Sequence, residues 1–347
     1  MHIMRKRKAV FRSDQGAVLI LVLWTLVILT AFTVNIGLRV RQKITLLARL
    51  EHRNQVRSIA FSCIQKAIAV LQDEIMMSQI NGFNPLLTKI VRLNNPSQFR
   101  QIVFGVGSGE ISYHDHGLGQ DSEKQYGVLD EEGRLNLNTA DRPALKRLIM
   151  AVLGMEEEEA DHLADAIYDW RVYGESEIVG FFSDEYYDNL EFPYKEKKAN
   201  FENLDELLLV RGVTERIYEN LLPFITVYGD GKIDINTASA PVLMALGFSP
   251  GLAAKIVVAR RGTDGIEATL DDLIFSSPDN LVGDLSALMG LSSGDTAEIN
   301  GAAGKLAVEG VHFRIHGEGH LDSVNERKEI TCVFNLQKNN VVYWREN

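Results

Sequence analysis

The chain has 347 residues, 46% of them hydrophobic, with 47 acidic and 36 basic side chains and a formal net charge of −11. This length exceeds that of a typical single domain, so we expect more than one compact unit. Residues 1–57 contain 11 of the basic residues and two acidic ones, which leaves 25 basic and 45 acidic residues, a net charge of −20, in residues 58–347. Phosphate groups repel a domain of this charge, which argues against a nucleic-acid-binding protein.

The first predicted element is an uncharged apolar segment, residues 17–38, which follows a basic segment ending at Gly16. As a helix it spans about 33 Å, enough to cross the roughly 30 Å hydrocarbon core of a bilayer. A secretory signal peptide has a shorter apolar region, of about 7 to 15 residues. Three interpretations are open: a plain signal anchor, a cleaved signal peptide, which the length disfavours, and a prepilin-like leader cut between Gly16 and Ala17.

A helical pattern continues beyond the apolar segment. From Leu46 to Ile75, apolar residues recur mostly at steps of three and four without an intervening proline. We therefore predict a single helix from about Ala17 to Ile75, with two separate helices joined near Asn35 and Gly37 as the alternative. Basic residues flank the apolar segment on both sides, so the positive-inside rule does not fix its orientation.

Short strand patterns flank a helical middle region. Apolar residues that alternate or cluster between glycine and aspartate breakers predict strands at residues 101–106, 110–114, 126–129, 311–316, 329–336 and 340–344. Strands so distant in sequence can complete one sheet if the helices between them form an insertion. The predicted order is a long helix, the first strands, a helical insert and the closing strands, which is an α+β fold.

An internal repeat organises the helical middle region. Residues 134–140, Arg-Leu-Asn-Leu-Asn-Thr-Ala, recur as residues 232–238, Lys-Ile-Asp-Ile-Asn-Thr-Ala, and each copy leads through a proline into a helical stretch. Asparagine and threonine side chains cap helix N-termini, so we predict a set of helical hairpins.

Similar hairpins bind DNA in helix-hairpin-helix proteins, where a glycine turn offers backbone N–H groups to a phosphate. Here four glutamates, residues 156–159, follow the turn of the first copy and oppose such binding. The second copy offers three basic residues, Lys255, Arg260 and Arg261. Structural use of the hairpins is favoured, and DNA binding is the alternative.

The two cysteines do not form a disulfide framework. Cys63 and Cys332 can pair if the long helix packs on a C-terminal strand in an oxidising compartment, or remain two buried thiols. No nucleophile, base and orienting group stand out together, so we predict no catalytic activity.

Three histidines, His312, His316 and His320, are spaced by four residues. We expect Gly317 and Gly319 to break the strand that carries them, which disfavours a zinc site.

The motifs taken together resemble the general secretion pathway protein K family, minor pseudopilins of type II secretion systems, over nearly the full chain. The residues that carry the resemblance are 14–24, both Asn-Thr-Ala motifs, 163–171, 184–187, 204–212, 222–228 and 343–346. The resemblance implies a pilin-like fold, a long N-terminal helix packed on an antiparallel sheet, with a large inserted α-helical domain of helix-hairpin-helix or SAM-like repeats.

The expected domains follow the chain. They are a prepilin leader (1–16), the transmembrane part of the helix (17–38), the rest of the helix with the first strands (39–135), a first α-helical insert (136–228), a second helix-hairpin-helix-like repeat (229–305) and the closing strands (306–347).

The resemblance also implies a function. Such a subunit caps or initiates the pseudopilus at its tip with minor pseudopilins of the I and J types, after a prepilin peptidase cuts between Gly16 and Ala17 and the new terminus is methylated. The other implied partners are the inner-membrane assembly platform and secreted proteins, with no nucleic acid. The implied location is the inner membrane, crossed once, with a cytoplasmic N-terminus and a periplasmic domain. A membrane-anchored helix-hairpin-helix DNA-binding protein of an uptake apparatus is the alternative.

Leu21 departs from most pilin-like subunits, which carry a glutamate five residues into the mature chain. A carboxylate in a membrane is costly and is kept for a partner. A subunit with no neighbour above it has no such partner, so Leu21 fits the tip.

Members of this family can hold calcium in an acidic loop, and clustered carboxylates suit this hard cation. In the matching region here, Val172, Tyr173 and Gly174 replace the family's acidic run, and Ser183 replaces a common glutamate. The remaining candidate ligands are Asp169, Glu175, Asp184, Glu185 and Asp188. The alternative is an acidic loop that is solvated and binds no metal.

Overall fold

The computed structural model describes residues 14–82, 84–117, 123–171, 184–322 and 326–347. The chain divides into two compact units, Met1–Gln55 and Val56–Asn347. One helix, α1 (Asp14–Asn81), begins in the first unit and ends in the second, and its 68 residues form an unbroken helix. The prediction of a single long helix is confirmed, and the alternative of two helices joined near Gly37 is wrong. A glycine costs a helix only about 1 kcal/mol, which its helix-forming neighbours outweigh.

The described part of the first unit is the N-terminal part of α1, whose large apolar side chains from Val18 to Leu50 are exposed. α1 is the one described helix with the length and composition to cross a membrane, and its most apolar window has a mean hydropathy of 2.4. Threonine hydroxyls in this part, such as those of Thr30 and Thr33, donate to carbonyls one turn earlier in the helix. A hydroxyl satisfied within its own helix suits a hydrocarbon environment, which offers no water as a partner.

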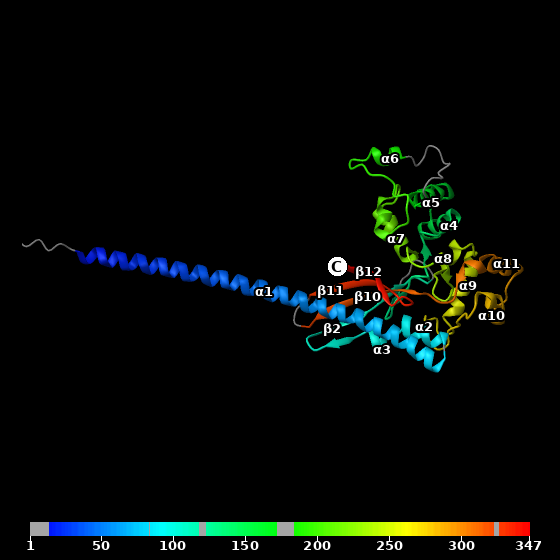
Figure 1. Ribbon diagram of the computed structural model, residues 1–347, viewed down its shortest axis with the longest axis horizontal. Helices are drawn as coiled ribbons and strands as arrows, with labels where there is room; N and C mark the ends of the chain where they lie inside the picture. The colour runs from blue at the N-terminus through cyan, green and yellow to red at the C-terminus, as the bar shows by residue number, and fades with distance from the viewer. Residues whose placement is uncertain (1–13, 83, 118–122, 172–183, 323–325) are drawn as a thin grey trace, which may run out of the picture. The chain divides into compact units, whose positions relative to one another are not determined.

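The second unit contains an antiparallel sheet with the strand order β1-β2-β10-β11-β12, in which β5 also pairs with β10. Its strands are β1 (Ile102–Phe104), β2 (Gly107–Ile111), β5 (Leu129–Asp130), β10 (His312–Leu321), β11 (Arg327–Asn335) and β12 (Asn340–Glu346). β2, drawn in cyan, lies beside β10 near the C-terminal end of the chain (Figure 1). Strands before the helical insert and strands after it therefore complete one sheet.

The second half of α1 packs on this sheet. A buried face of the helix from Val56 to Leu71 forms a core with strand residues that include Ile111, Phe313 and Ile330. Each fully buried side chain of this size contributes roughly 1.5 to 3 kcal/mol. Both cysteines belong to this core.

Cys63 and Cys332 are buried free thiols in this structure. Burial raises the pKa of each thiol to about 12, so both stay protonated and unreactive at neutral pH.

Glycines of β2 and β10 let α1 approach the sheet closely. A Cβ atom at Gly319 would lie 2.5 Å from the Val56 carbonyl oxygen, and one at Gly317 would lie 3.2 Å from the Ala60 carbonyl oxygen. The expectation that these two glycines break the strand is wrong, because β10 runs through both of them. They serve as contact points for a helix, a role of glycine that a sequence does not distinguish from a turn.

The unbroken strand gives a better reason against a zinc site. Histidines four residues apart on a strand are separated by about 13 Å, too far to share one ion. His312 Nδ1 lies 2.7 Å from Glu132 Oε1, and His316 Nδ1 lies 3.0 Å from Thr331 Oγ1.

The helical insert contains two short pairs of parallel strands. β6 (Leu135–Asn136) pairs with β7 (Ile225–Thr226), and β8 (Ile233–Asp234) pairs with β9 (Leu306–Ala307). We call residues 135–226 the first helical module and residues 233–307 the second. The first contains α4 (Arg142–Leu153), α5 (Glu157–Arg171), α6 (Asp184–Asp188), the 3-10 helix Leu204–Leu209 and α7 (Glu215–Leu221). The second contains α8 (Ala240–Ala245), α9 (Pro250–Arg260), α10 (Leu281–Leu288) and α11 (Ser293–Ala302).

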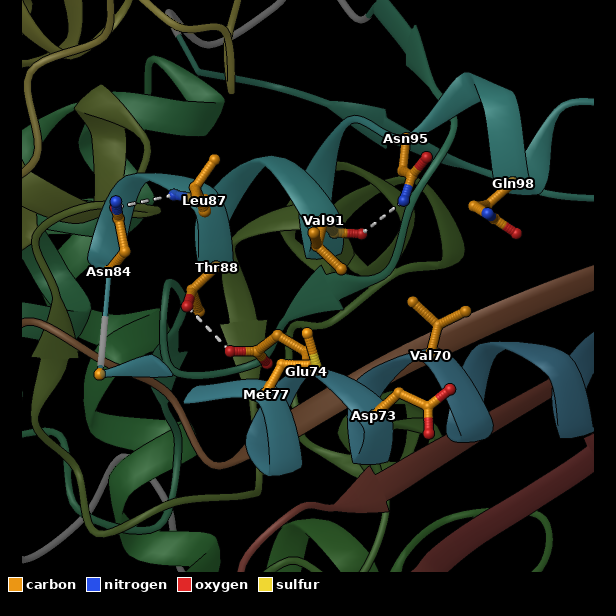
Figure 2. A pocket seen from close by; sticks show the side chains of 11 residues that line it. Val70, Asp73, Glu74, Met77, Asn84, Leu87, Thr88, Val91, Asn95 and Gln98 are labelled. Atoms are coloured by element: carbon orange, nitrogen blue, oxygen red, sulfur yellow. Dashed lines mark hydrogen bonds between the residues drawn. The ribbon is translucent and has the colours of Figure 1, made fainter. Parts of the chain in front are cut away.

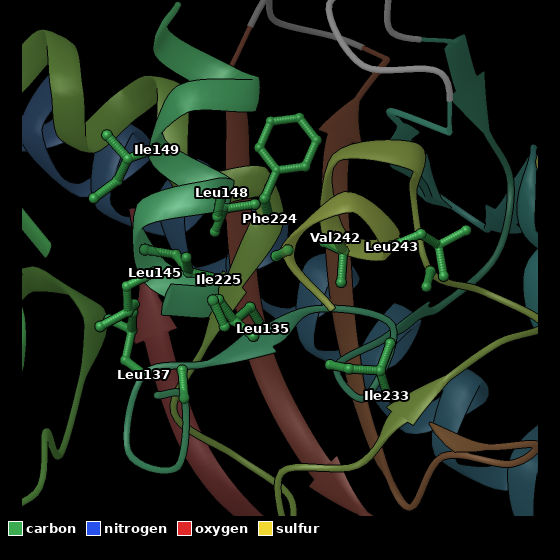
Figure 3. Close-up of a cluster of buried hydrophobic side chains, with 14 of the residues drawn as sticks. Leu135, Leu137, Leu145, Leu148, Ile149, Phe224, Ile225, Ile233, Val242 and Leu243 are labelled. Atoms are coloured by element: carbon green, nitrogen blue, oxygen red, sulfur yellow. The ribbon is translucent and has the colours of Figure 1, made fainter. Parts of the chain in front are cut away.

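The two modules share one hydrophobic core, in which α4 packs against α8. Figure 3 shows side chains of both modules in this cluster, among them Leu145, Leu148, Phe224 and Val242. Outside the two modules lie also α2 (Pro85–Leu93), α3 (Pro96–Phe99), β3 (Tyr113–Asp115) and β4 (Glu123–Gln125).

Candidate functional site

In each module an asparagine of the repeat holds a distant phenylalanine by its backbone. Asn138 Oδ1 accepts the N–H of Phe201 at 2.8 Å, and its Nδ2 donates to the Phe201 carbonyl at 3.0 Å. Asn236 makes the same two bonds with Phe275, both at 2.9 Å. The same residue of each motif therefore anchors the chain where it returns from a loop.

In each module, the arginine that ends the second helix, α5 or α9, donates a hydrogen bond to the repeat motif at the start of the module. Arg171 donates to the carbonyl of Ala140, and Arg260 donates to the carbonyl of Ala238 at 2.7 Å. These alanines end the two Asn-Thr-Ala motifs. Each of these bonds joins a side chain to a backbone group of a residue distant in sequence. Because residues of every type carry a backbone carbonyl, and all but proline an N–H, the residue that provides the backbone group can vary.

The loop between the arginine and the phenylalanine differs between the modules. We call residues 172–200 the first loop and residues 261–274 the second loop. Of the first loop, residues 172–183 lie outside the described residues, and Glu175 is among them.

The described candidate calcium residues lie beside the first loop or in it. Asp169, in the last turn of α5, is 3% exposed, and its Oδ1 accepts from Arg142 Nη2 at 3.1 Å. Its Oδ2 is buried and has no hydrogen-bond partner among the described residues. Asp188 is exposed at the end of α6, which also contains Asp184 and Glu185, although the side chains of those two are not described. The described part of the chain contains no group of three side chains suited to a metal ion.

Aromatic rings hold the two flanks of residues 172–183 together. Trp170, next to Asp169, packs against Tyr187 of α6 with ring centroids 5.9 Å apart, and against Tyr194 at 6.3 Å. The Tyr187 hydroxyl accepts the N–H of Arg211 at 3.1 Å. The end of α5 and the helix α6 are therefore fixed close to each other.

The second loop is organised by its own side chains. Asp271 accepts hydrogen bonds from the N–H and hydroxyl of Thr263, at 2.6 and 2.7 Å, and from the hydroxyl of Thr269 at 2.7 Å. These bonds to its charged form lower the pKa of Asp271 below its ordinary value.

Buried ion pairs tie the second loop to helix α2. Lys89 Nζ lies 2.6 Å from Glu267 Oε1 and 3.0 Å from Asp272 Oδ2, and all three side chains are buried. Burial opposes ionisation of Glu267, but the charges of Arg260, Lys89 and Arg261 outweigh it and lower the pKa of this carboxyl. Glu267 and Asp272 of the second loop are thus neutralised within the protein.

The three basic residues that could favour DNA at the second hairpin are engaged in internal contacts. Arg260 is 1% exposed, Arg261 pairs with Asp115 and Glu267, and Lys255 pairs with Asp295 at 3.0 Å.

Three consecutive acidic residues, Asp130, Glu131 and Glu132, are buried where the sheet meets the first module. Burial and the neighbouring Asp234 raise the pKa of Asp130 well above its ordinary value. Burial also opposes ionisation of Glu131, but Arg314 pairs with it and outweighs that effect, so the pKa of Glu131 is lowered.

Glu132 completes this junction. It accepts the N–H of His312 at 2.9 Å, and its backbone carbonyl accepts the N–H of Asp234 at 2.9 Å. Sequence reasoning missed this junction because a run of acids in a sequence is typical of a solvated turn. The residues that stabilise it belong to β8 and β10, about 100 and 180 residues away in sequence.

The processing junction lies in the first turns of α1. Gly16 is exposed, with no atom within 4 Å of the position of a Cβ, and Leu21 is 65% exposed. The cleavage between Gly16 and Ala17 stays a prediction.

A groove of about 490 Å³ lies between the C-terminal part of α1 and α2 (Figure 2). Its walls include Val70, Leu87 and Val91, and its carboxylate Glu74 accepts from Thr88 Oγ1 at 2.8 Å and also pairs with a buried arginine of α2. The groove is mainly apolar, and its described lining residues include no set of groups suited to catalysis.

Comparison with known proteins relates this architecture to a family. The family model described as "Type II secretion system (T2SS), protein K" matches residues 128–230, from the acidic junction to just past β7. Type II secretion system protein K of Pseudomonas aeruginosa is 27% identical over 271 residues, which are 75% of this chain and 76% of that protein. The chain is thus similar to type II secretion system protein K over three quarters of its length.

Two further comparisons extend this result. The protein K of Aeromonas hydrophila is 34% identical over 106 residues, 29% of this chain and 32% of that protein. A chain in the crystal structure of the GspK-GspI-GspJ complex from enterotoxigenic Escherichia coli has the same fold, with a TM-score of 0.59 and 14% identity over 87% of this chain and 99% of that one. The mixed fold of a long N-terminal helix with an antiparallel sheet is therefore that of a solved structure.

Proposed function

We propose that this chain is a protein K of a type II secretion system, a minor pseudopilin that caps or initiates the pseudopilus at its tip, together with minor pseudopilins of the I and J types. The observation that carries the proposal is the relation to protein K over three quarters of both sequences. The fold match to a chain of a GspK-GspI-GspJ complex supports the choice of partners. Leu21 supports the tip position, because a subunit without a neighbour above it needs no buried carboxylate in the membrane.

Co-expression with the I- and J-type pseudopilins of the same system tests this function. A complex that survives purification is expected, and recovery of this chain alone under conditions that keep I and J together would contradict it. Titration with duplex DNA at low salt tests the alternative of a DNA-binding protein, for which tight salt-dependent binding is required.

We infer that the chain crosses the inner membrane once, with its N-terminus in the cytoplasm and the unit Val56–Asn347 in the periplasm, where it meets the assembly platform and secreted proteins. A prepilin peptidase cuts between Gly16 and Ala17. N-terminal sequencing of the mature protein is expected to begin at a methylated Ala17, and Gly16→Val is expected to leave Met1 in place. Protease added to spheroplasts should digest the periplasmic unit.

We further propose that the helical modules are helix-hairpin-helix, SAM-like units used as a structural scaffold. The matching contacts of Asn138 and Asn236 support this use, as do the internal partners of Lys255, Arg260 and Arg261.

The first loop is the proposed calcium site, with Asp169, Glu175, Asp184, Glu185 and Asp188 as ligands. The buried Oδ2 of Asp169 supports it, because a carboxylate oxygen without a partner is costly unless a cation meets it. Calorimetric titration is expected to show one calcium site that Asp169→Asn weakens by about tenfold or more. No heat of binding in the unsubstituted protein would favour a solvated loop.

A further inference from the structure

Three basic residues follow the apolar segment of α1 directly. Arg39, Arg41 and Lys43 are exposed, and no described residue forms an ion pair with any of them. The nearest acidic residue along the helix, Glu51, accepts a hydrogen bond from Gln55 instead. These three charges are therefore available to a partner outside the chain.

The length of the apolar segment places these residues at a membrane surface. Residues 17–38 cover the hydrocarbon core, so the next residues of the same unbroken helix enter the headgroup layer. This layer is about 5 to 8 Å deep on each side of the bilayer, and the rise from Arg39 to Lys43 is about 6 Å. All three basic residues thus fit within the depth of the headgroups.

The charges surround the helix. At about 100° per residue, Arg41 lies roughly 200° around the helix from Arg39, while Lys43 lies about 40° from it. A protein partner covers one face of a helix, whereas lipid headgroups surround it on all sides. Exposed cations on opposite faces at this depth therefore fit phosphate headgroups better than a packed subunit.

We propose that Arg39, Arg41 and Lys43 form a collar that binds anionic phospholipid headgroups at the membrane surface next to residue 38. The inference rests on the membrane crossing proposed above. The collar would hold the helix at a fixed depth in the bilayer. Each basic residue at an anionic surface contributes about 1 kcal/mol, which is about a fivefold local enrichment of the anionic lipid.

Quenching by brominated lipids measures this enrichment. The full chain carrying Trp24→Phe and Val40→Trp is reconstituted into phosphatidylcholine vesicles with a minor fraction of phosphatidylglycerol. Bromine is placed either on the phosphatidylglycerol or on an equal fraction of the phosphatidylcholine. We expect the brominated phosphatidylglycerol to quench the indole at position 40 as strongly as about a fivefold larger fraction of brominated phosphatidylcholine. Added salt is expected to reduce the difference.

Two variants locate the effect. The triple variant Arg39→Gln, Arg41→Gln and Lys43→Gln is expected to abolish the preference. Arg53→Gln, on the same helix but about 22 Å beyond residue 38 and so outside the headgroup layer, is expected to retain it.

The outcomes separate the inference from the proposed function. Equal quenching by both lipids, or a preference that survives the triple substitution, overturns the collar and leaves the pseudopilin function standing. If neither lipid quenches the indole, residue 40 does not lie at the membrane. That result would contradict the membrane crossing on which both the collar and the proposed function depend.

Discussion

The two helical modules anchor loops of very different length with the same contacts. In the first module 29 residues separate Arg171 from Phe201, and in the second 14 residues separate Arg260 from Phe275. Both arginines bond to the alanine of an Asn-Thr-Ala motif, and both phenylalanines are held by the asparagine of that motif. Because these contacts use backbone groups, the anchored segment can vary in sequence without loss of the bond.

The loops themselves differ in how their acids are balanced. Glu267 and Asp272 of the second loop are buried against Lys89, and Asp271 is saturated by hydrogen bonds within the loop. Asp169, beside the first loop, keeps one buried oxygen without a described partner. The described acids of the two modules thus differ, since Glu267 and Asp272 are paired with a cation of the protein and the Oδ2 atom of Asp169 is not.

The largest expected effect comes from the two arginines. Arg260→Met removes a fully buried cation, takes away one of the charges that face Glu267 and leaves the carbonyls of Ile235 and Ala238 without its hydrogen bonds, so we expect a loss of about 3 to 5 kcal/mol in the free energy of unfolding. Arg171→Met leaves one carbonyl without its partner and should cost about 1 to 3 kcal/mol. Denaturant unfolding of the full chain in detergent measures both.

Lys255→Met is the matched control for these variants, because Lys255 is partly exposed and its ion pair contributes at most about 1 kcal/mol. Equal losses of unfolding free energy for Arg260→Met and Arg171→Met would contradict the expectation that the arginine of the second module contributes more.

The asparagines test the shared part of the scaffold. Asn236 is 4% exposed, so Asn236→Ala leaves the buried N–H and carbonyl of Phe275 unsatisfied, at a cost of about 2 to 3 kcal/mol. Asn138 is half-buried, and Asn138→Ala should cost about 1 to 2 kcal/mol, since water replaces part of the lost bonding. Thermal unfolding of the two variants checks the order, and an insensitive Asn236 would show that the motif does not anchor the loop.

Calcium should act on one loop only. We expect added calcium to slow protease cleavage within residues 172–200 several-fold and to leave cleavage within residues 261–274 unchanged, because the second loop has its own cations. Limited proteolysis with mass-spectrometric identification of the cut sites measures this. Asp169→Asn should remove the protection, whereas protection of both loops would indicate a general effect of the ion.

The smallest expected effect is a pH dependence of the second loop. The pKa of Asp271 is held below its ordinary value of 3.8, so its carboxylate stabilises the loop above about pH 4 and this contribution is lost as the pH falls below that value. Amide hydrogen exchange at Thr263 and Asp264 should quicken in acid beyond the intrinsic pH dependence. In the Asp271→Asn variant, exchange at these two amides should be fast both above and below pH 4. Slow exchange in that variant would show that contacts other than those of Asp271 hold the loop.

Local patterns in the sequence predicted much of this protein correctly. The recurrence of apolar residues at steps of three and four correctly predicted the unbroken helix α1, because this pattern depends only on residues close together in sequence. The alternating strands near both ends predicted a sheet closed by its C-terminal strands, and β2 and β10 do pair. The repeated Asn-Thr-Ala motif marked the start of each module, although its contacts with Phe201 and Phe275 could not be inferred from spacing.

Tertiary structure decided the points that depend on partners far away in sequence. Gly317 and Gly319 look like strand breakers until α1 is seen to lie against them. The acids 130–132 look like a solvated turn until Arg314, His312 and Asp234 are brought to them from β10 and β8. In both cases the sequence gives the type of each residue but not its neighbours in space. Whether a helix lies against a glycine, or a buried charge has a partner, depends on those neighbours.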